Sequence, residues 1–279
     1  MGLRTYYWDK RNASLYKYYK NKIINPDLFY FKTGNMGDIF NIDLIKHIYK
    51  ENPINITDDN NRLLLVGSVA SKVKYGDIIN GIGWKGDNLD YMADIISSLK
   101  VFGVRGPLTK KLFQKCGCDL SNLKFEYDPG LLIKEVYDLD LTTSKEKNIL
   151  FIPHFADEKV YKGVYPKGVE FVSVDSSPKR IAKKILNSKI IYTSSLHGII
   201  FSHALKKPCV FVKPQSNEPM FKYEDYFLSV GLKFIEPIKD IFSLNFILDK
   251  PSFLEKNIGI DDFYFPEKKL LLDCKILKR

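Results

Sequence analysis

The sequence predicts an α/β protein with two doubly wound, Rossmann-like domains that face each other across a cleft. Short β-branched and aromatic runs alternate with helical stretches, as they do when crossover helices connect the strands of a parallel sheet. The 279 residues, 45% of them hydrophobic, can bury two full cores. A polar stretch without periodicity, residues 138–148, separates two such alternations. We therefore predict domains at 1–140 and 141–279, with the last helix of the chain able to pack back on the first domain.

In the first half, a glycine-bearing turn precedes a helix predicted from Ile39 to Tyr49, with Asp38 at its start. The segment 106–117 begins with Gly-Pro and ends with Gly, which is typical of a short helix. Apolar runs that end in small or polar turns predict the strands around these helices. These runs are residues 28–31, 62–67, 77–83, 100–105 and 123–128.

The second half repeats the alternation of strands and helices. Its last part is a βαβ unit, because two β-branched runs flank a polar turn and a short helical stretch. The predicted strands are 149–154, 168–174, 190–192 and 209–212, and the predicted helices are 178–187 and 197–205.

The net charge of +10 and the isoelectric point near 9.1 indicate an anionic partner: a phosphorylated metabolite, a nucleic acid or an acidic membrane face. The lysines are dispersed and lack the interleaved aromatic residues of an RNA-binding motif, so we expect no nucleic-acid partner. The amino terminus has no signal-peptide core, and no apolar run approaches the ~18 residues of a membrane helix. We expect a cytoplasmic protein that can touch the inner membrane through its charge.

The four cysteines favour reduced thiols over a metal site. The closest pair has the spacing C-x-C, which is neither that of a zinc ribbon nor that of a thioredoxin motif. No carboxylate pair has an obvious metal-ligand spacing either. We predict no metal and no cofactor. The cysteines are Cys116, Cys118, Cys209 and Cys274.

Polar turns follow several of the predicted strands. Ligands of parallel α/β sheets gather at the carboxyl ends of the strands, so these turns are candidates for one shared site. His197 lies in the turn of the βαβ unit and is the first candidate. The turns are 34–38, 105–107, 128–130, 153–154 and 194–198.

These motifs, in this order, resemble the polysaccharide pyruvyl transferase family, especially its succinoglycan-type members. The resemblance runs from about residue 30 to about residue 215. It is carried by the segments GNMGD, GDIINGIGW, VRGPLT, YDPGLL, IPH and SLHGIIFSHALKKP. The resemblance implies a GT-B-like pair of domains and transfer of pyruvate from phosphoenolpyruvate to a hydroxyl, or a pair of hydroxyls, on a glycan or lipid-linked sugar. It places such an enzyme in the biosynthesis of bacterial surface polysaccharide.

The implied reaction needs a proton donor for the methylene carbon of the donor and a base for the sugar hydroxyl. His197 and His154 titrate near neutrality and suit proton transfer. Asp38 either caps its helix or accepts the proton of the hydroxyl, and the two roles are compatible. We expect Asn35, Gly37 and Trp84 on the acceptor side, which is assigned to the first domain.

The reaction also needs a positive pocket for the donor phosphate and carboxylate, expected in the second domain. Arg105 can grip an anion with its planar guanidinium group. Ser194, Ser195 and Gly198 offer hydroxyl and N–H groups at a helix amino terminus. Many relatives carry an arginine where this chain has Ser195, so Arg105, Lys213 or Lys32 would have to supply that charge.

Three other assignments remain open. A serine pair beside a histidine also resembles bacterial sialyltransferases, so the alternative function is a glycosyltransferase that uses a nucleotide sugar such as a CMP-linked acidic sugar. A relative that only binds its ligand would have an incomplete pocket. Asp128 is expected to brace its turn, and His47 and His203 to be surface or core residues of helices.

Overall fold

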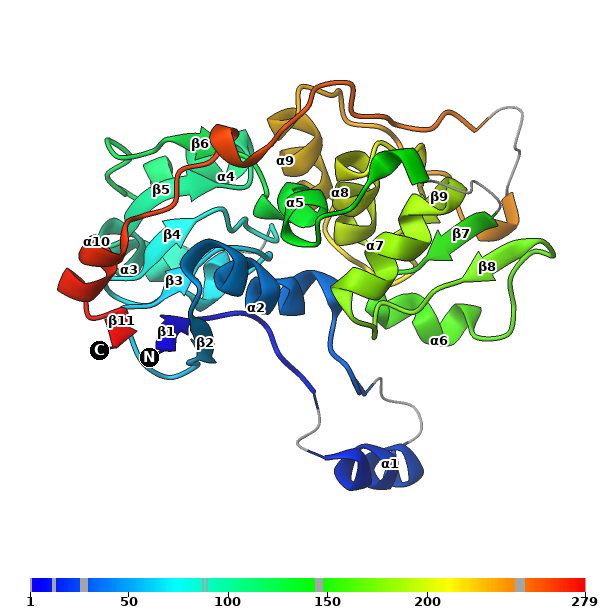
Figure 1. Cartoon of the computed structure of the whole chain (residues 1–279), viewed down its shortest axis with the longest axis horizontal. Coiled ribbons are helices and arrows are strands. Elements are labelled where there is room, and N and C mark those ends of the chain that lie inside the picture. Colours follow the sequence, from blue (N-terminus) through cyan, green and yellow to red (C-terminus); the bar gives the residue numbers. More distant parts are fainter. Residues whose placement is uncertain are drawn as a thin grey trace.

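The protein is an α/β protein with two largely parallel sheets, as predicted (Figure 1). The structure, a computed structural model, describes residues 2–11, 14–25, 30–86, 88, 90–143, 148–243 and 249–278. Of the predicted strand at 28–31, Leu28 and Phe29 lie outside these residues, as do residues 144–147 of the predicted linker. The domain boundary at 140/141 remains a prediction.

The first sheet has seven strands in the described residues, in the order β11-β1-β3-β4-β5-β6, with β2 also paired to β1. Its pairs are parallel except for β1 with β11, so the carboxyl-terminal strand returns to the first sheet. The strands are β1 (Gly2–Thr5), β2 (Asn52–Asn55), β3 (Leu63–Leu64), β4 (Ile78–Asn80), β5 (Lys100–Val104), β6 (Phe125–Glu126) and β11 (Leu277–Lys278).

The second sheet is parallel throughout its described strands, in the order β10-β9-β7-β8. Its pairing of β9 with both β7 and β10 confirms the predicted βαβ unit. The strands are β7 (Asn148–Ile152), β8 (Val169–Phe171), β9 (Ser188–Thr193) and β10 (Cys209–Phe211).

The four predicted helices are present as α2, α4, α7 and α8, displaced by at most three residues at their ends. Helices α1, α3, α5, α6 and α9 were not predicted. No helix in the described ranges is both long and apolar enough to cross a membrane. The helices are α1 (Leu15–Ile24), α2 (Met36–Tyr49), α3 (Ala93–Ser97), α4 (Pro107–Lys115), α5 (Ile133–Val136), α6 (Glu158–Tyr161), α7 (Pro178–Leu186), α8 (Leu196–Ala204), α9 (Phe221–Ser229) and α10 (Lys268–Asp273).

One hydrophobic core extends under both sheets. Phe40 of α2 packs edge-on against Phe201 of α8, with ring centroids 5.6 Å apart, and both side chains are fully buried. Helix α5 lies between the two sheets and contacts both α2 and α8 (Figure 1). The two sheets are therefore joined by close packing as well as by the chain.

A carboxylate from the second half of the chain binds the start of a helix in the first half. The Asp225 Oδ1 atom, on α9, accepts hydrogen bonds from the backbone N–H groups of Leu108 and Thr109, at 2.9 and 3.0 Å. Its Oδ2 atom accepts from the Thr109 hydroxyl at 2.6 Å and from Arg105 Nε at 3.1 Å. This carboxylate caps α4 and neutralises a buried guanidinium group at once.

A second carboxylate binds the turn that leads into α2. Asp175 accepts hydrogen bonds from three consecutive backbone N–H groups, those of Lys32, Thr33 and Gly34, at 2.8, 2.6 and 2.9 Å. The N–H of Met36 also donates to the Val174 carbonyl, at 2.9 Å. The amino terminus of α2 is therefore held by the loop after β8.

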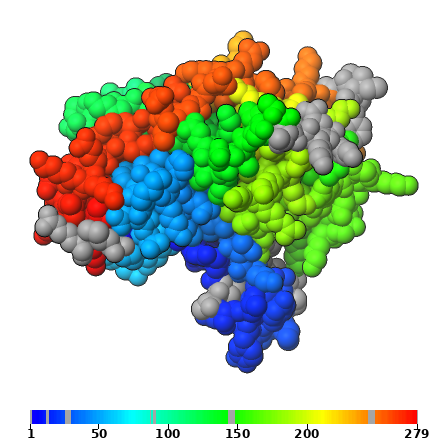
Figure 2. Space-filling view, in the orientation of Figure 1, coloured from blue at the N-terminus to red at the C-terminus, as the bar shows by residue number. Residues whose placement is uncertain are grey.

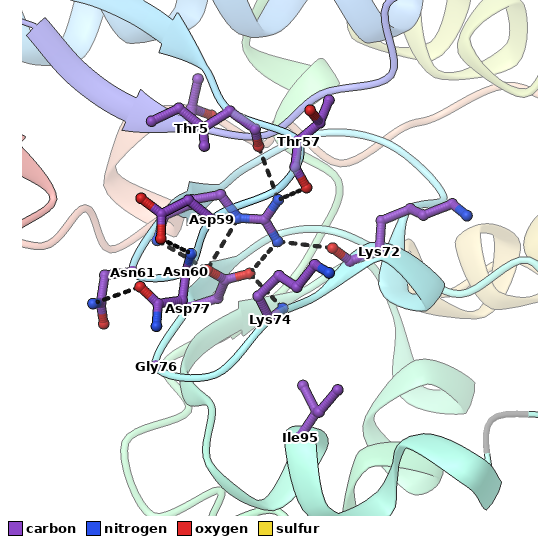
Figure 3. Close-up of polar contacts among 12 residues, drawn as sticks. Thr5, Thr57, Asp59, Asn60, Asn61, Lys72, Lys74, Gly76, Asp77 and Ile95 are labelled. Carbon is purple, nitrogen blue, oxygen red and sulfur yellow. Dashed lines mark hydrogen bonds and ion pairs between the residues drawn. The ribbon is translucent and has the colours of Figure 1, made fainter.

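A buried ion pair stabilises the entrances to β3 and β4. The Arg62 guanidinium donates to Asp77 Oδ2 at 2.6 Å and to the Lys72 carbonyl at 2.8 Å. Asp77 also accepts from the backbone N–H of Lys74 at 2.8 Å, and Figure 3 shows Lys74 beside this carboxylate and the carbonyl groups of Lys72 and Thr57 beside the guanidinium. The network fixes the backbone at Lys72, one of the residues that line the cavity described below.

Removing the charge of Asp225 should destabilise the protein strongly. In Asp225→Asn the buried guanidinium of Arg105 loses its counter-charge, and breaking a buried pair costs about 3–5 kcal/mol. Glu224→Gln, on the exposed face of the same helix, is the matched control and should change the free energy of unfolding by less than about 0.5 kcal/mol. Urea unfolding of both variants measures the difference. A loss below about 1 kcal/mol in Asp225→Asn would contradict the anchoring role.

Candidate active site

A cavity of about 250 Å³ lies between the two sheets, where the carboxyl ends of β3, β7 and β9 converge. This is the edge at which ligands of parallel α/β sheets bind. The lining comes from the exit of β1, the start of α2, the loops after β3 and β4, the exit of β7, and the starts of α8 and α9. The lining residues are Trp8, Asn35, Asp38, Ser68, Val69, Ser71, Lys72, Lys85, His154, Phe155, Ser195, Leu196, His197, Glu218 and Lys222.

The turn between β9 and α8 is held from inside by Thr193. Its hydroxyl donates to the Ile152 carbonyl at 2.6 Å and accepts from the N–H of Ser195 at 3.0 Å. Gly198 packs directly on this hydroxyl, because a Cβ atom at Gly198 would lie only 2.2 Å from Thr193 Oγ1. The close approach explains the glycine after His197 and fixes where the histidine leaves the turn.

His197 lines the cavity and has one imidazole nitrogen without a hydrogen-bond partner in the described residues. The imidazole packs against Gly37, where a Cβ atom would lie 2.0 Å from Nδ1, and near Phe201, with ring centroids 5.7 Å apart. Nε2 is buried without a hydrogen-bond partner in the described residues and lies 4.0 Å from Asp128 Oδ1. Burial, reinforced by Arg105 and Lys222, lowers the pKa of His197 to about 3. The ring is therefore neutral at physiological pH.

Asp38, in the first turn of α2, is a carboxyl group that can carry a proton at neutral pH. Burial raises the pKa of Asp38 to about 7; Lys222 opposes this shift, and Asp9 and Asp128 add to it. The side chain retains some exposed surface, which faces the cavity. A carboxyl group with this pKa suits general acid catalysis.

Two lysines share one carboxylate on the opposite wall. Lys222 Nζ lies 2.6 Å from Glu218 Oε2, and Lys85 Nζ lies 2.9 Å from Glu218 Oε1. Burial alone would raise the pKa of Glu218, but Lys222, His154 and Lys85 lower it to about 2. Because two ammonium groups face one carboxylate, this wall has an excess of positive charge. Such an excess suits an anionic ligand.

His154 lies between these charges and the second sheet. Its Nδ1 atom is 3.3 Å from the Ser216 hydroxyl, and its Nε2 atom is 3.7 Å from Glu218 Oε1. Burial, Lys222 and Lys85 lower the pKa of His154 to about 3, while Glu218 opposes the shift. The neutral ring can donate or accept a hydrogen bond toward the cavity.

Several predicted site residues meet at this cavity. His197, His154, Asp38, Asn35 and Ser195 all line it. Gly37 and Gly198 support it from behind through their close contacts with His197 and Thr193. The assignment of catalytic and binding roles to them stays a prediction.

Ser194 is positioned as a brace. Its hydroxyl accepts from the His154 N–H at 2.7 Å and lies 3.3 Å from Asp157 Oδ2, and its carbonyl accepts from the Tyr223 hydroxyl at 2.7 Å. Trp84 and Lys213 do not line the cavity; Lys213 is exposed elsewhere. Trp84 packs edge-on against Phe221, with ring centroids 5.2 Å apart.

Arg105 is fully buried outside the cavity wall, although sequence analysis expected it to grip the donor. Besides its bond to Asp225, its guanidinium donates from Nη1 to the Ser68 hydroxyl at 2.6 Å and from Nη2 to the Trp84 carbonyl at 2.5 Å. All three guanidinium nitrogens are thus engaged internally. Arg105 contributes long-range positive charge and holds Ser68, which lines the cavity.

Asp128 and His203 have structural contacts, as expected from the sequence. The Asp128 carboxylate accepts from the N–H of Gly130 at 2.8 Å and caps the short 3-10 helix Pro129–Leu132. Burial raises the pKa of Asp128 to about 6, against the hydrogen bond from Gly130 and the charge of Arg105. His203 is a core residue, with hydrogen bonds of 2.9 Å to the Tyr226 hydroxyl and 3.0 Å to that of Ser252.

The cavity wall formed by Lys222, Lys85 and Glu218, called the lysine wall below, was not predicted from the sequence. Lys222, Glu218 and Lys85 belong to no motif, and only the packing of α9 against the first half brings them together. Within the described ranges, no group of three or more histidine, cysteine, aspartate or glutamate side chains is arranged to hold a metal ion.

The fold and the site define an α/β protein with a cationic, histidine-bearing cavity between two parallel sheets. Residues 5–216 match the polysaccharide pyruvyl transferase family, and the chain belongs to that family. This confirms the resemblance drawn from the motifs.

Two curated proteins are similar over most of the chain. One is "Uncharacterized protein L143" of Acanthamoeba polyphaga mimivirus, 26% identical over 268 residues that cover 89% of this chain and 90% of that protein. The other is "Succinoglycan biosynthesis protein ExoV" of Rhizobium meliloti, 24% identical over 216 residues that cover 72% of this chain and 63% of that protein. A solved structure of an uncharacterized Klebsiella pneumoniae protein, 13% identical, aligns over 80% of this chain and all of that one with a TM-score of 0.45.

A methyl group at Gly37 should displace the imidazole of His197. Gly37→Ala places a Cβ atom where the ring now lies, while alanine itself suits the helix. We expect transfer activity to fall by about 100-fold, because reacting groups tolerate little misplacement, with a loss of about 2 kcal/mol or less in stability. Lys46→Ala, on an exposed position of the same helix, is the control. Wild-type activity in Gly37→Ala would show that the ring position does not matter.

Proposed function

We propose that the protein transfers pyruvate from phosphoenolpyruvate to a hydroxyl, or a pair of hydroxyls, on a sugar acceptor. The observation that carries the proposal is the arrangement of the cavity: an excess of positive charge on one wall, and a protonatable carboxyl group and a neutral histidine on the others. The cavity volume of about 250 Å³ lies just below the usual range of ~300–1,000 Å³ for small-molecule sites and suits a three-carbon donor.

Lys222 and Lys85 are the proposed ligands of the donor's phosphate and carboxylate. They take the role that sequence analysis gave to Arg105, whose guanidinium is engaged elsewhere. Lys72, on the cavity wall beside Ser71, adds a third cation. A buried ammonium group is a stronger anion ligand than an exposed one, because water screens it less.

Asp38 is the proposed proton donor and His197 the proposed base. In the first step Asp38 protonates the methylene carbon of phosphoenolpyruvate, the sugar oxygen bonds to the neighbouring carbon, and His197 takes the hydroxyl proton. The carbon–oxygen bond to phosphate then breaks, and inorganic phosphate leaves. If a second hydroxyl of the sugar attacks the same carbon and loses its proton, the product is a ketal; if only one hydroxyl reacts, the new methyl group returns a proton to Asp38 and the product is an enolpyruvyl ether. This assignment reverses the role of Asp38 expected from the sequence, because its raised pKa favours the acid form.

The alternative donor, a nucleotide sugar, would need the hydroxyl of Ser194 or Ser195 as a phosphate ligand, and of the two only Ser195 lines the cavity. The Ser194 hydroxyl is engaged internally, by the His154 N–H and by Asp157. We therefore favour the compact donor, and the nucleotides serve as competing ligands in the test.

Donor binding should depend on Lys222. Lys222→Met keeps the length of the side chain and removes the charge, and loss of a charged contact of about 2–5 kcal/mol weakens binding by about 30-fold or more. Lys213→Met, at an exposed position outside the cavity, should bind the donor like the wild type. Calorimetric titration with phosphoenolpyruvate, CMP and UDP compares the compact donor with the two nucleotides. Tighter binding of CMP or UDP than of phosphoenolpyruvate would refute the proposal.

The rate should fall above neutral pH because Asp38 must be protonated. Burial raises the pKa of Asp38 to about 7, so its acid form declines by about tenfold for each pH unit above that value. We expect kcat/KM for the donor to show this alkaline limb. Asp38→Asn should lower kcat by about 100-fold or more and remove the limb. An unchanged pH profile in Asp38→Asn would assign the limb to another group.

A further inference from the structure

Helix α1 is an amphipathic element that stands out from the body of the protein (Figures 1 and 2). None of its residues is buried. Five large side chains are mainly solvent-exposed: Leu15 by 55%, Tyr16 by 76%, Tyr19 by 54%, Ile23 by 82% and Ile24 by 66%. Most exposed hydrophobic residues in proteins occur singly, so a cluster of this kind marks an interaction surface.

Four of these side chains form a stripe along one side of the helix, and Ile24 lies on the other side. Leu15, Tyr19 and Ile23 follow each other at intervals of four residues, and Tyr16 lies beside Ile23 on the wheel. Lys20 and Lys22 flank the stripe on its two sides, and Lys17 lies on the opposite face. Apolar and aromatic side chains bordered by lysines are typical of a helix that lies in a membrane interface.

The charge of the helix has one sign. The sequence LYKYYKNKII carries three lysines and no acidic residue, in a chain whose net charge is +10. An anionic lipid surface attracts such a segment, at about 1 kcal/mol for each lysine near it. A second copy of the same helix would repel it, so charge complementarity favours an anionic surface as the occupant.

The residues that precede and follow α1 in the sequence, Arg11 and Phe31, lie next to the cavity residue Trp8. Arg11 and Phe31 form an isolated parallel bridge. Phe31 packs edge-on against Trp8, a cavity residue, with ring centroids 5.2 Å apart, and Trp8 lies 5.4 Å from Phe155, another one. A surface that binds α1 is therefore brought close to the cavity.

We propose that α1 binds the surface of an anionic lipid bilayer and holds the cavity beside it, where a lipid-linked sugar can serve as acceptor. The membrane contact stands on the exposure, pattern and charge of α1, and the choice of acceptor rests on the proposed function.

Flotation of the full-length protein with lipid vesicles tests the contact. Vesicles of phosphatidylglycerol and phosphatidylcholine should bind it, and vesicles of phosphatidylcholine alone should bind it at least about tenfold more weakly. The triple variant Lys17→Gln, Lys20→Gln, Lys22→Gln should lose at least about tenfold in binding to the anionic vesicles. Tyr19→Ser with Ile23→Ser should lose a similar factor by removing apolar contact.

The matched control removes the same charge from another exposed helix. Lys179→Gln, Arg180→Gln and Lys183→Gln in α7 should leave vesicle binding within about threefold of the wild type. Equal losses in both triple variants would show that net charge alone binds the lipid and would overturn the proposal. Wild-type binding by the α1 variants would overturn it too, as would an α1-dependent dimer in sedimentation with no vesicle binding.

Calorimetry with phosphoenolpyruvate on the same α1 variants separates this proposal from the proposed function. The variants should bind the donor like the wild type, because α1 does not line the cavity. Vesicle binding without donor binding would leave the membrane contact intact and refute the function. Donor binding without vesicle binding would refute the membrane contact and leave the proposed function intact.

Discussion

The carboxylate of Asp225 is the contact on which the two walls of the cavity depend. It joins α9, in the second half of the chain, to the amino terminus of α4 and to Arg105. Lys222 lies one helical turn before Asp225, so the capping bond also sets the position of the cavity's buried ammonium group. On the other side Arg105 holds Ser68 and the Trp84 carbonyl. One buried ion pair thus positions cavity residues from two sheets, at the desolvation cost that such pairs carry.

Asp175 plays the corresponding part for the cavity wall that carries Asp38. By accepting three backbone hydrogen bonds it sets the start of α2, and with it Asp38 and Gly37. His197 then fits against Gly37 from the other sheet. The proposed acid and base come from different sheets, and their separation is fixed by packing that leaves no room for a methyl group. Burial at this junction raises the pKa of Asp38 to about 7, which suits a proton donor, and lowers the pKa of His197 to about 3, which keeps its ring neutral.

Periodicity and capping signals predicted the elements that carry most of the site. Helices α2 and α8 were found because apolar spacing and glycine-bearing turns mark their starts. The first-sheet strands β1, β2 and β11 were missed, since they are two to four residues long and β2 contains proline and asparagine, which local propensity disfavours in strands. Tertiary pairing, which a short segment does not encode by itself, decides such strands.

The position of a site residue could be predicted where the residue directly follows a strand. It could not be predicted where the side chain contacts a residue far away in the sequence. The strand-end rule brought His197, His154 and Asp38 together correctly at one cavity. It also placed Arg105 at a strand end, but the side chain turns inward to Asp225, 120 residues further along the chain. In the lysine wall, the contact of Lys85 with Glu218 depends on the same long-range packing, and no local sequence pattern predicts it.

A structure determined with phosphoenolpyruvate bound tests the central claim, that residues held together by the two carboxylate anchors form one donor site. We predict that a phosphate or carboxylate oxygen of the donor lies within hydrogen-bond distance of Lys222 Nζ and that the methylene carbon faces Asp38. The Arg105–Asp225 pair should remain intact in that complex. Phosphoenolpyruvate bound outside this cavity, or bound to an Arg105 released from Asp225, would contradict the account.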